Sequence, residues 1–132
     1  MDAPREVKIA LLTSWCVLVI ETVDRFRRIS TDPDVNYYSR LKFNLTAETV
    51  SATVIVAIFI VAASRRQNWG RIALLVSTLG GWLLWLLYAL TFAQYGVWQW
   101  LGYGSITAME LAALLLLFRG KGALWYQRPR VE

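Results

Sequence analysis

The chain has 132 residues, enough for a single domain over residues 1–132, and it is 57% hydrophobic with a formal net charge of +5. Its mean hydropathy of +0.43 is too high for an ordinary soluble domain of this size. It has no histidine and one cysteine. This excludes histidine-ligated metals and haem, histidine-based catalysis, internal disulfides and cysteine-only metal clusters.

The first apolar segment predicts an uncleaved transmembrane helix over residues 7–28. A short polar leader precedes an apolar run from Ile9 to Ile20. This pattern is typical of a signal peptide, but no cleavage site with small residues follows it. Glu21 and Arg25 are four residues apart in the last turns, so they can pair along one face of the helix.

Residues 29–44 form a soluble connection, in which Pro33 between Asp32 and Asp34 predicts a turn. A short interfacial helix can follow this turn, and Asn44 is a suitable N-cap for the next helix. That helix is predicted over residues 45–64, which contain an apolar run between polar flanks. A segment that crosses a bilayer must hydrogen-bond its backbone groups internally, and a helix does so.

The second half of the chain predicts a membrane helical hairpin. Residues 71–94 and 98–118 are each apolar and of a length that crosses a bilayer, at a rise of ~1.5 Å per residue. Residues 93–100 predict an uncharged aromatic turn at the interface between them. Residues 119–130 are basic, contain an aromatic pair, and are expected at the level of the lipid head groups.

The distribution of basic residues predicts that both termini are cytoplasmic. Nine basic residues lie on the side of the termini and of the connector between the second and third spans: Arg5, Lys8, Arg65, Arg66, Arg71, Arg119, Lys121, Arg128 and Arg130. Five lie on the other side, all in the first loop: Arg25, Arg27, Arg28, Arg40 and Lys42.

Together these elements predict an all-α fold, an integral membrane four-helix bundle. The short polar leader, the four spans and the basic connector Arg-x-Asn-Trp-Gly-Arg from Arg66 to Arg71 resemble a family of uncharacterised small four-helix inner-membrane proteins of bacteria. The resemblance implies a location in the bacterial inner membrane and brings no catalytic residues with it.

Glu110 is the charged residue in the interior of this hairpin, and an intramembrane carboxyl is a candidate functional site. It shares a helical face with Tyr103 and Thr107. At its depth we expect no basic residue, which favours the neutral acid. Glu110 can serve as a proton-relay or substrate-binding carboxyl. Alternatively, it can stabilise the packing of helices through a hydrogen bond with Ser14, Thr13 or a Trp indole, or contact a partner protein.

Three carboxyls lie near the outer membrane face. Glu21 and Asp24 are expected to pair with Arg25 and Arg28, and a cation-binding cluster with Glu48 is the alternative. Glu48 also suits the positive N-terminal end of its own helix.

Small residues at four-residue spacing let helix backbones approach closely. They are Ser77 and Gly81 in the third span and Gly104, Ala108 and Ala112 in the fourth. We expect them to seat these two spans against each other, the alternative being a homodimer or subunit contact.

Trp69, Trp98 and Trp100 are typical of interface anchors. Trp82 and Trp85 lie deeper, where they can pack in the core or cover a lipid-soluble ligand such as a quinone. Cys16 is expected to be a small buried apolar residue.

The expected function is non-enzymatic, since no nucleotide-binding, metalloprotease or hydrolase motif is present. The chain is predicted to be a structural or accessory component of the inner membrane. The alternative is a small homo-oligomeric transporter or channel that uses Glu110. Expected partners are membrane lipids and a homo-oligomer or larger membrane complex, with no nucleic acid, metal or cofactor.

Overall fold

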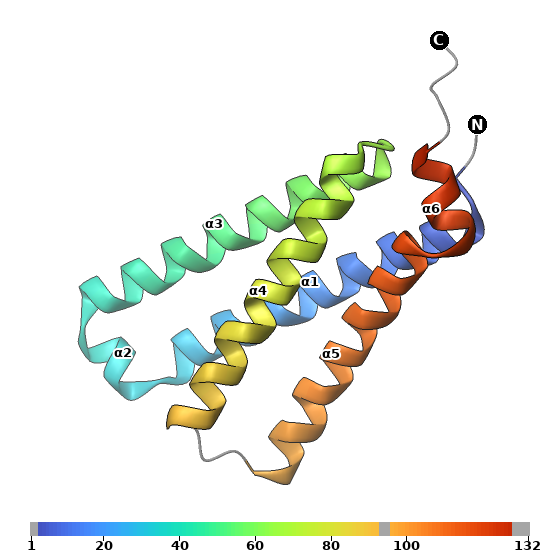
Figure 1. The fold of residues 1–132 in the computed structure, drawn as a ribbon. Coiled ribbons are helices and arrows are strands. Elements are labelled where there is room, and N and C mark those ends of the chain that lie inside the picture. The colour runs from blue at the N-terminus through green and yellow to red at the C-terminus, as the bar shows by residue number, and fades with distance from the viewer. Residues whose placement is uncertain (1–2, 93–95, 128–132) are drawn as a thin grey trace.

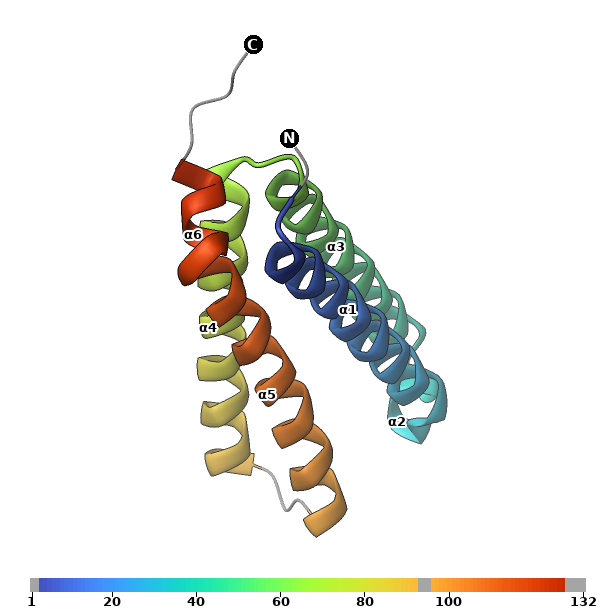
Figure 2. The same cartoon turned by 90° about the vertical axis from the view of Figure 1, so that its right-hand side faces the viewer.

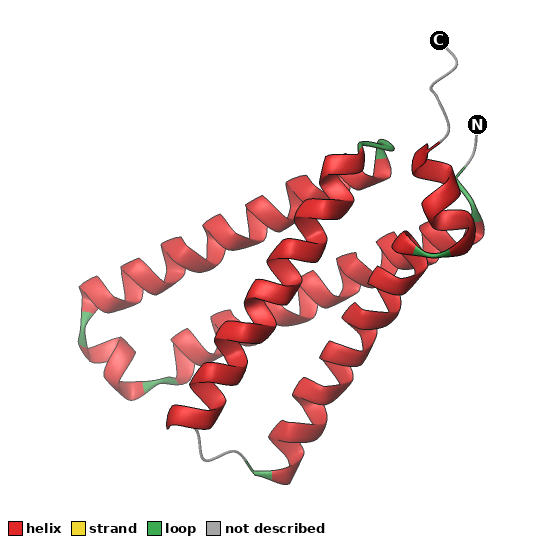
Figure 3. Cartoon of the chain, in the orientation of Figure 1, coloured by secondary structure: helices red, strands yellow, loops and turns green. Residues whose placement is uncertain are grey.

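The computed structural model describes residues 3–92 and 96–127, which are all-α and contain no strand in these two ranges (Figure 3). Four long helices correspond to the four predicted spans, and two short helices accompany them. In chain order they are α1 (Arg5–Thr31), α2 (Pro33–Tyr37), α3 (Ser39–Ser64), α4 (Asn68–Phe92), α5 (Val97–Phe118) and α6 (Gly120–Gln127).

The prediction that Asn44 caps a helix is wrong, because α3 begins at Ser39 and Asn44 lies inside it. The turn predicted at Pro33 is confirmed as the start of α2. The side chain of Asp32 caps this helix by accepting hydrogen bonds from the backbone N–H groups of Asp34 at 2.9 Å and Val35 at 3.3 Å. Of the turn predicted over residues 93–100, residues 93–95 lie outside the described ranges, as do residues 128–130 of the tail.

Three helices, α3, α4 and α5, are long and apolar enough to cross a membrane. α1 has the length, but Lys8 and Glu21 bound its apolar stretch and further charges follow at Asp24, Arg25 and Arg28. The four spans predicted from the sequence are therefore matched by three long apolar helices and one long helix with charged ends.

The long helices pack in an order that differs from their order in the chain. α1 packs against both α3 and α5, and α4 packs against α3, whereas α4 and α5 touch each other little. The helices converge at the end that carries α6 and diverge toward the opposite end (Figures 1 and 2). The predicted hairpin of α4 and α5 is thus consecutive in the chain but open in space.

The buried core lies at the convergent end. It combines the start of α1, the end of α3, the start of α4, the end of α5 and both aromatic residues of α6. Its fully buried members are Val7, Ala10, Ile60, Ala63 and Leu117.

The C-terminal helix α6 belongs to this core. Trp125 and Tyr126 are buried, and the Tyr126 hydroxyl donates a hydrogen bond to the Ala63 carbonyl at 2.8 Å. Arg66 donates to the Trp125 carbonyl at 2.6 Å, and the Arg71 guanidinium lies 4.6 Å from the centre of the Tyr126 ring. The aromatic pair of the basic tail is therefore packed inside the protein at this end. The Tyr126 hydroxyl and the Trp125 carbonyl have hydrogen-bond partners, whereas the buried indole Nε1 of Trp125 has none among the described residues.

Two glycines permit the close turns at this end. A Cβ atom at Gly70 would lie 2.5 Å from the Ala63 nitrogen, and one at Gly122 would lie 2.0 Å from the Leu116 oxygen. Glycine is therefore required where α4 turns back on α3 and where α6 folds back on α5.

Candidate functional site

The divergence of the helices leaves a cavity of about 840 Å³ between α1, α3, α4 and α5. It lies beside the separation of α4 and α5, each of which packs against a different neighbour. Its polar and aromatic lining comes from three helices: Ser14, Glu21, Asp24, Arg25 and Arg28 of α1, Ser77, Thr78, Trp82, Trp85 and Tyr88 of α4, and Tyr103, Thr107 and Glu110 of α5. Helix α3 contributes an apolar wall.

Glu110 lies in this cavity and not on the outer surface. The indole Nε1 of Trp82 on α4 donates a hydrogen bond to its carboxylate Oε2 at 2.5 Å. This bond joins two helices that otherwise touch little. Tyr103 and Thr107 line the same cavity from the same helix, as the spacing predicts.

Ser14 also lines the cavity, but its hydroxyl donates to the Ala10 carbonyl at 3.0 Å and not to Glu110. Of the hydrogen-bond donors that we considered for Glu110, a Trp indole fills this role. Sequence spacing could not select Trp82, because the bond depends on how α4 and α5 are placed.

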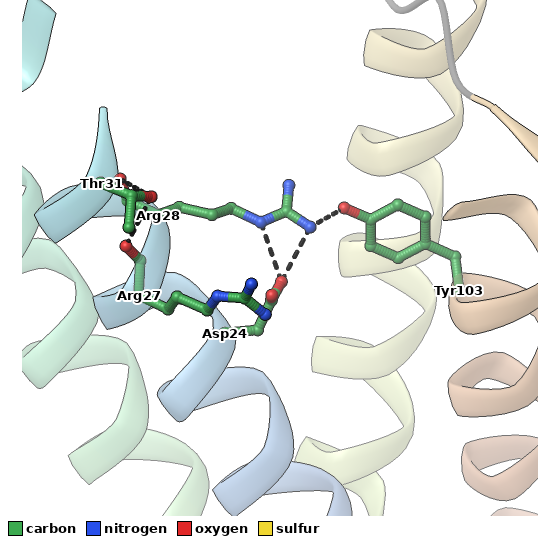
Figure 4. Close-up of polar contacts among 5 residues, drawn as sticks. All are labelled: Asp24, Arg27, Arg28, Thr31 and Tyr103. Carbon is green, nitrogen blue, oxygen red and sulfur yellow. Dashed lines mark hydrogen bonds and ion pairs between the residues drawn. The ribbon is translucent and has the colours of Figure 1, made fainter. Parts of the chain in front are cut away.

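At the divergent end, Arg28 bridges α1 and α5. Its guanidinium forms an ion pair with Asp24 at 2.8 Å and donates a hydrogen bond to the Tyr103 hydroxyl (Figure 4). Asp24 and Arg28 were expected to pair, but the bond to Tyr103 was not foreseen, since the two residues are far apart in the chain.

Glu21 lies deeper along the same helix, and Arg25 attracts its carboxyl electrostatically without forming the ion pair that the spacing predicted. Glu48 is exposed on α3 and does not line the cavity. Within residues 3–92 and 96–127 there is no group of three histidine, cysteine, aspartate or glutamate residues that could hold a metal ion. The alternative cluster of Glu21, Asp24 and Glu48 is therefore not formed, since Glu48 does not line the cavity that the other two carboxyls line.

We expected the small residues to seat α4 against α5, and the structure shows that they do not. Gly104, Ala108 and Ala112 are exposed on α5, and a Cβ at Gly81 or Gly104 would meet nothing within 4 Å. Ser77 and Gly81 line the cavity. The close helix approach is made at Gly70 instead, against Ala62 and Ala63 of α3.

Trp82 and Trp85 both line the cavity, and the Trp85 ring packs against the rings of Trp100 and Tyr103. Both roles considered for them, packing against other side chains and covering a ligand site, are compatible with this position. Cys16, expected to be buried, is exposed on α1.

Comparison with protein-family models, with curated proteins and with solved structures gives no match, so the assignment of function depends on the geometry.

Proposed function

We propose that the chain is a four-span integral membrane protein, in which α1 crosses the bilayer with α3, α4 and α5. The packing of α1 between α3 and α5 supports this, because a helix packed between two membrane-spanning helices lies at the same depth in the bilayer as they do. Large apolar side chains on the outer faces also support it. Leu83, Leu90 and Leu101 are all more than half exposed and do not line the cavity, as lipid contact requires.

The orientation with both termini in the cytoplasm is part of this proposal. α1 begins and α6 ends at the same end of the bundle, where Glu6 and Lys121 lie 3.6 Å apart (Figure 1). The basic connector with Arg65 and Arg66 lies at this end too. The positive-inside rule favours placing such an end in the cytoplasm. The resemblance to small bacterial inner-membrane proteins favours that membrane.

The function that the geometry supports best is binding and transport of a small solute, with Glu110 as the coupling carboxyl. The observation that carries this proposal is the cavity. Its volume of about 840 Å³ lies in the range of ~300–1,000 Å³ typical of ligand sites. A carboxyl placed in such a cavity inside a membrane is costly, and such groups mark solute or proton pathways.

Uptake into proteoliposomes tests this function. The panel contains one cationic, one anionic and one neutral organic solute, driven by a pH gradient. We expect wild-type protein to transport at least one of them above empty liposomes, and Glu110→Gln to abolish this transport. The matched control is Glu48→Gln, since Glu48 is exposed outside the cavity. Transport of none of the solutes, or equal transport by Glu110→Gln, would contradict the proposal.

A second candidate function, as an accessory subunit of a larger complex or homo-oligomer, is favoured by one specific observation. Gly104, Ala108 and Ala112 form a small-residue face on α5 that is exposed, with no other described helix covering it. Purification in mild detergent with mass spectrometry tests it. A co-purifying subunit or a stable oligomer that Ala108→Leu disrupts supports this role, and a monodisperse monomer contradicts it.

A further inference from the structure

The charges that line the cavity do not balance. Three carboxyls line it, those of Glu21, Asp24 and Glu110, against two guanidiniums, those of Arg25 and Arg28. Arg28 forms an ion pair with Asp24 at 2.8 Å, whereas Arg25 attracts the Glu21 carboxyl without forming an ion pair with it. Glu110 receives the Trp82 indole N–H, which is a neutral donor. One carboxyl therefore lacks a cationic counterpart within the cavity.

The two cations also lie toward the divergent end, in the last turns of α1, and Glu110 lies deeper. The Arg28 guanidinium is further committed to the Tyr103 hydroxyl across the cavity (Figure 4). An anionic ligand at Glu110 would meet a carboxyl before it met a free cation. A cationic ligand would meet a carboxyl that forms no ion pair with the cations of the lining.

The walls suit a cation that carries an apolar body. Trp82, Trp85, Tyr88 and Tyr103 line the cavity, and aromatic rings attract cations through their quadrupole. Aliphatic side chains of α1, α3 and α5 make up much of the remaining lining. A metal ion would not use these walls, and no group of three acidic, histidine or cysteine residues in the described ranges could coordinate one.

On the basis of the solute-binding function above, we propose that the cavity binds a lipophilic organic cation, with its charge at Glu110 and its apolar body against the aromatic walls. Glu110 then acts as a binding residue that selects for positive charge. Arg28 and Tyr103 close the site at its divergent end. Trp82 is a positioning residue, because its indole N–H fixes the carboxylate toward the cavity.

The test uses three probes of similar shape and different charge, namely tetraphenylphosphonium, tetraphenylborate and neutral triphenylphosphine oxide. Binding to the purified protein in detergent is measured by isothermal titration calorimetry. We expect the cation to bind about tenfold or more tightly than either other probe, since a bound cation stabilises the ionised form of Glu110 over the neutral acid expected at this depth, and the other two probes do not. Glu110→Gln should lower cation affinity by about tenfold and leave affinity for the neutral probe unchanged.

Glu110→Asp keeps the charge and should retain the preference for the cation, and Glu48→Gln should behave as wild type. The charge preference of the wild-type protein is itself a readout, so the test does not depend on the folding of any variant. Equal or tighter binding of the borate or the neutral probe would overturn the cation assignment while leaving a solute-binding cavity. Binding of none of the three probes would overturn the cavity function itself.

Discussion

The hydroxyl of Tyr126, in the last helix, donates a buried hydrogen bond of 2.8 Å to the carbonyl of Ala63, near the end of α3. This bond ties the C-terminal helix to the corner between α3 and α4. The same corner receives Arg66, which donates to Trp125, and Gly70, which packs on Ala63. The convergent end of the bundle is therefore held by contacts between residues about 60 positions apart, while the opposite end stays open around the cavity.

Tyr126→Phe should lower the free energy of unfolding by about 1 kcal/mol, the usual net contribution of one hydrogen bond. A larger loss is not expected, because the Arg66 backbone N–H also donates to the Ala63 carbonyl at 3.0 Å. Denaturant titration in detergent measures the change. Tyr37→Phe is the control, since Tyr37 is 81% exposed, and an equal loss in both variants would contradict the role of this bond.

The titration of Tyr126 provides a pH test. Burial raises the pKa of Tyr126 from 10 to about 12, although the nearby Arg71 lowers it. Because the folded state holds this proton more tightly than the unfolded state, its stabilising contribution is complete below pH 10 and is lost as the pH rises toward about 12.

We therefore expect wild-type stability to fall more steeply over this pH interval than that of Tyr126→Phe. In a titration with rising pH, the tyrosinate absorbance that appears at the highest pH in the wild-type protein should be missing from Tyr126→Phe. Identical pH profiles for the two proteins would contradict the burial of this hydroxyl.

Gly70→Ala should destabilise the protein by about 1–3 kcal/mol, the range for an overpacked site. Its new Cβ would lie 2.5 Å from the Ala63 nitrogen and 2.7 Å from the Ala62 Cβ, and backbone atoms cannot move aside cheaply. Gly102→Ala is the matched control, because a Cβ there meets nothing within 4 Å. The control should be neutral or more stable by up to about 1 kcal/mol, as expected for alanine inside a helix.

The bridge from Arg28 to Tyr103 should limit access to the cavity from its divergent end. Tyr103→Phe removes the acceptor of this bond and keeps the ring. Access is measured as the rate at which a small maleimide modifies Thr107→Cys, introduced with Cys16→Ala so that the exposed native thiol does not react.

We expect Tyr103→Phe to raise this rate by about fivefold, corresponding to a partly exposed charged hydrogen bond of about 1 kcal/mol. Arg28→Ala should have a similar effect. The double variant should add little, since both changes break the same bond. Fully additive effects, or none, would show that this bridge does not close the cavity.

Much of the fold could be read from local sequence. The apolar runs placed the four long helices within a few residues of their observed bounds, because helix formation and apolarity are properties of neighbouring residues. The start of α3 was missed, since the segment from Ser39 to Asn44 is polar and aromatic and does not continue the apolar run. The predicted hairpin is confirmed as two long apolar helices, and the prediction that these two pack closely against each other is wrong.

The candidate site could be predicted only in part. Glu110 was identified because a charged residue inside an apolar run is conspicuous, and its face with Tyr103 and Thr107 follows from helical periodicity. Neither the Trp82 donor nor the Arg28 bridge could be found in this way. Both depend on the relative placement of helices, to which separation along the chain is a poor guide.

The sequence by itself determined that the chain is helical, apolar on long segments, and carries one carboxyl in the interior of its last long helix. The tertiary structure decided that α4 and α5 separate, that a cavity opens between the four long helices with Glu110 inside it, and that α6 is part of the core. The physical reason is that helix formation is satisfied by hydrogen bonds within each segment, whereas helix pairing depends on how whole side-chain surfaces fit each other.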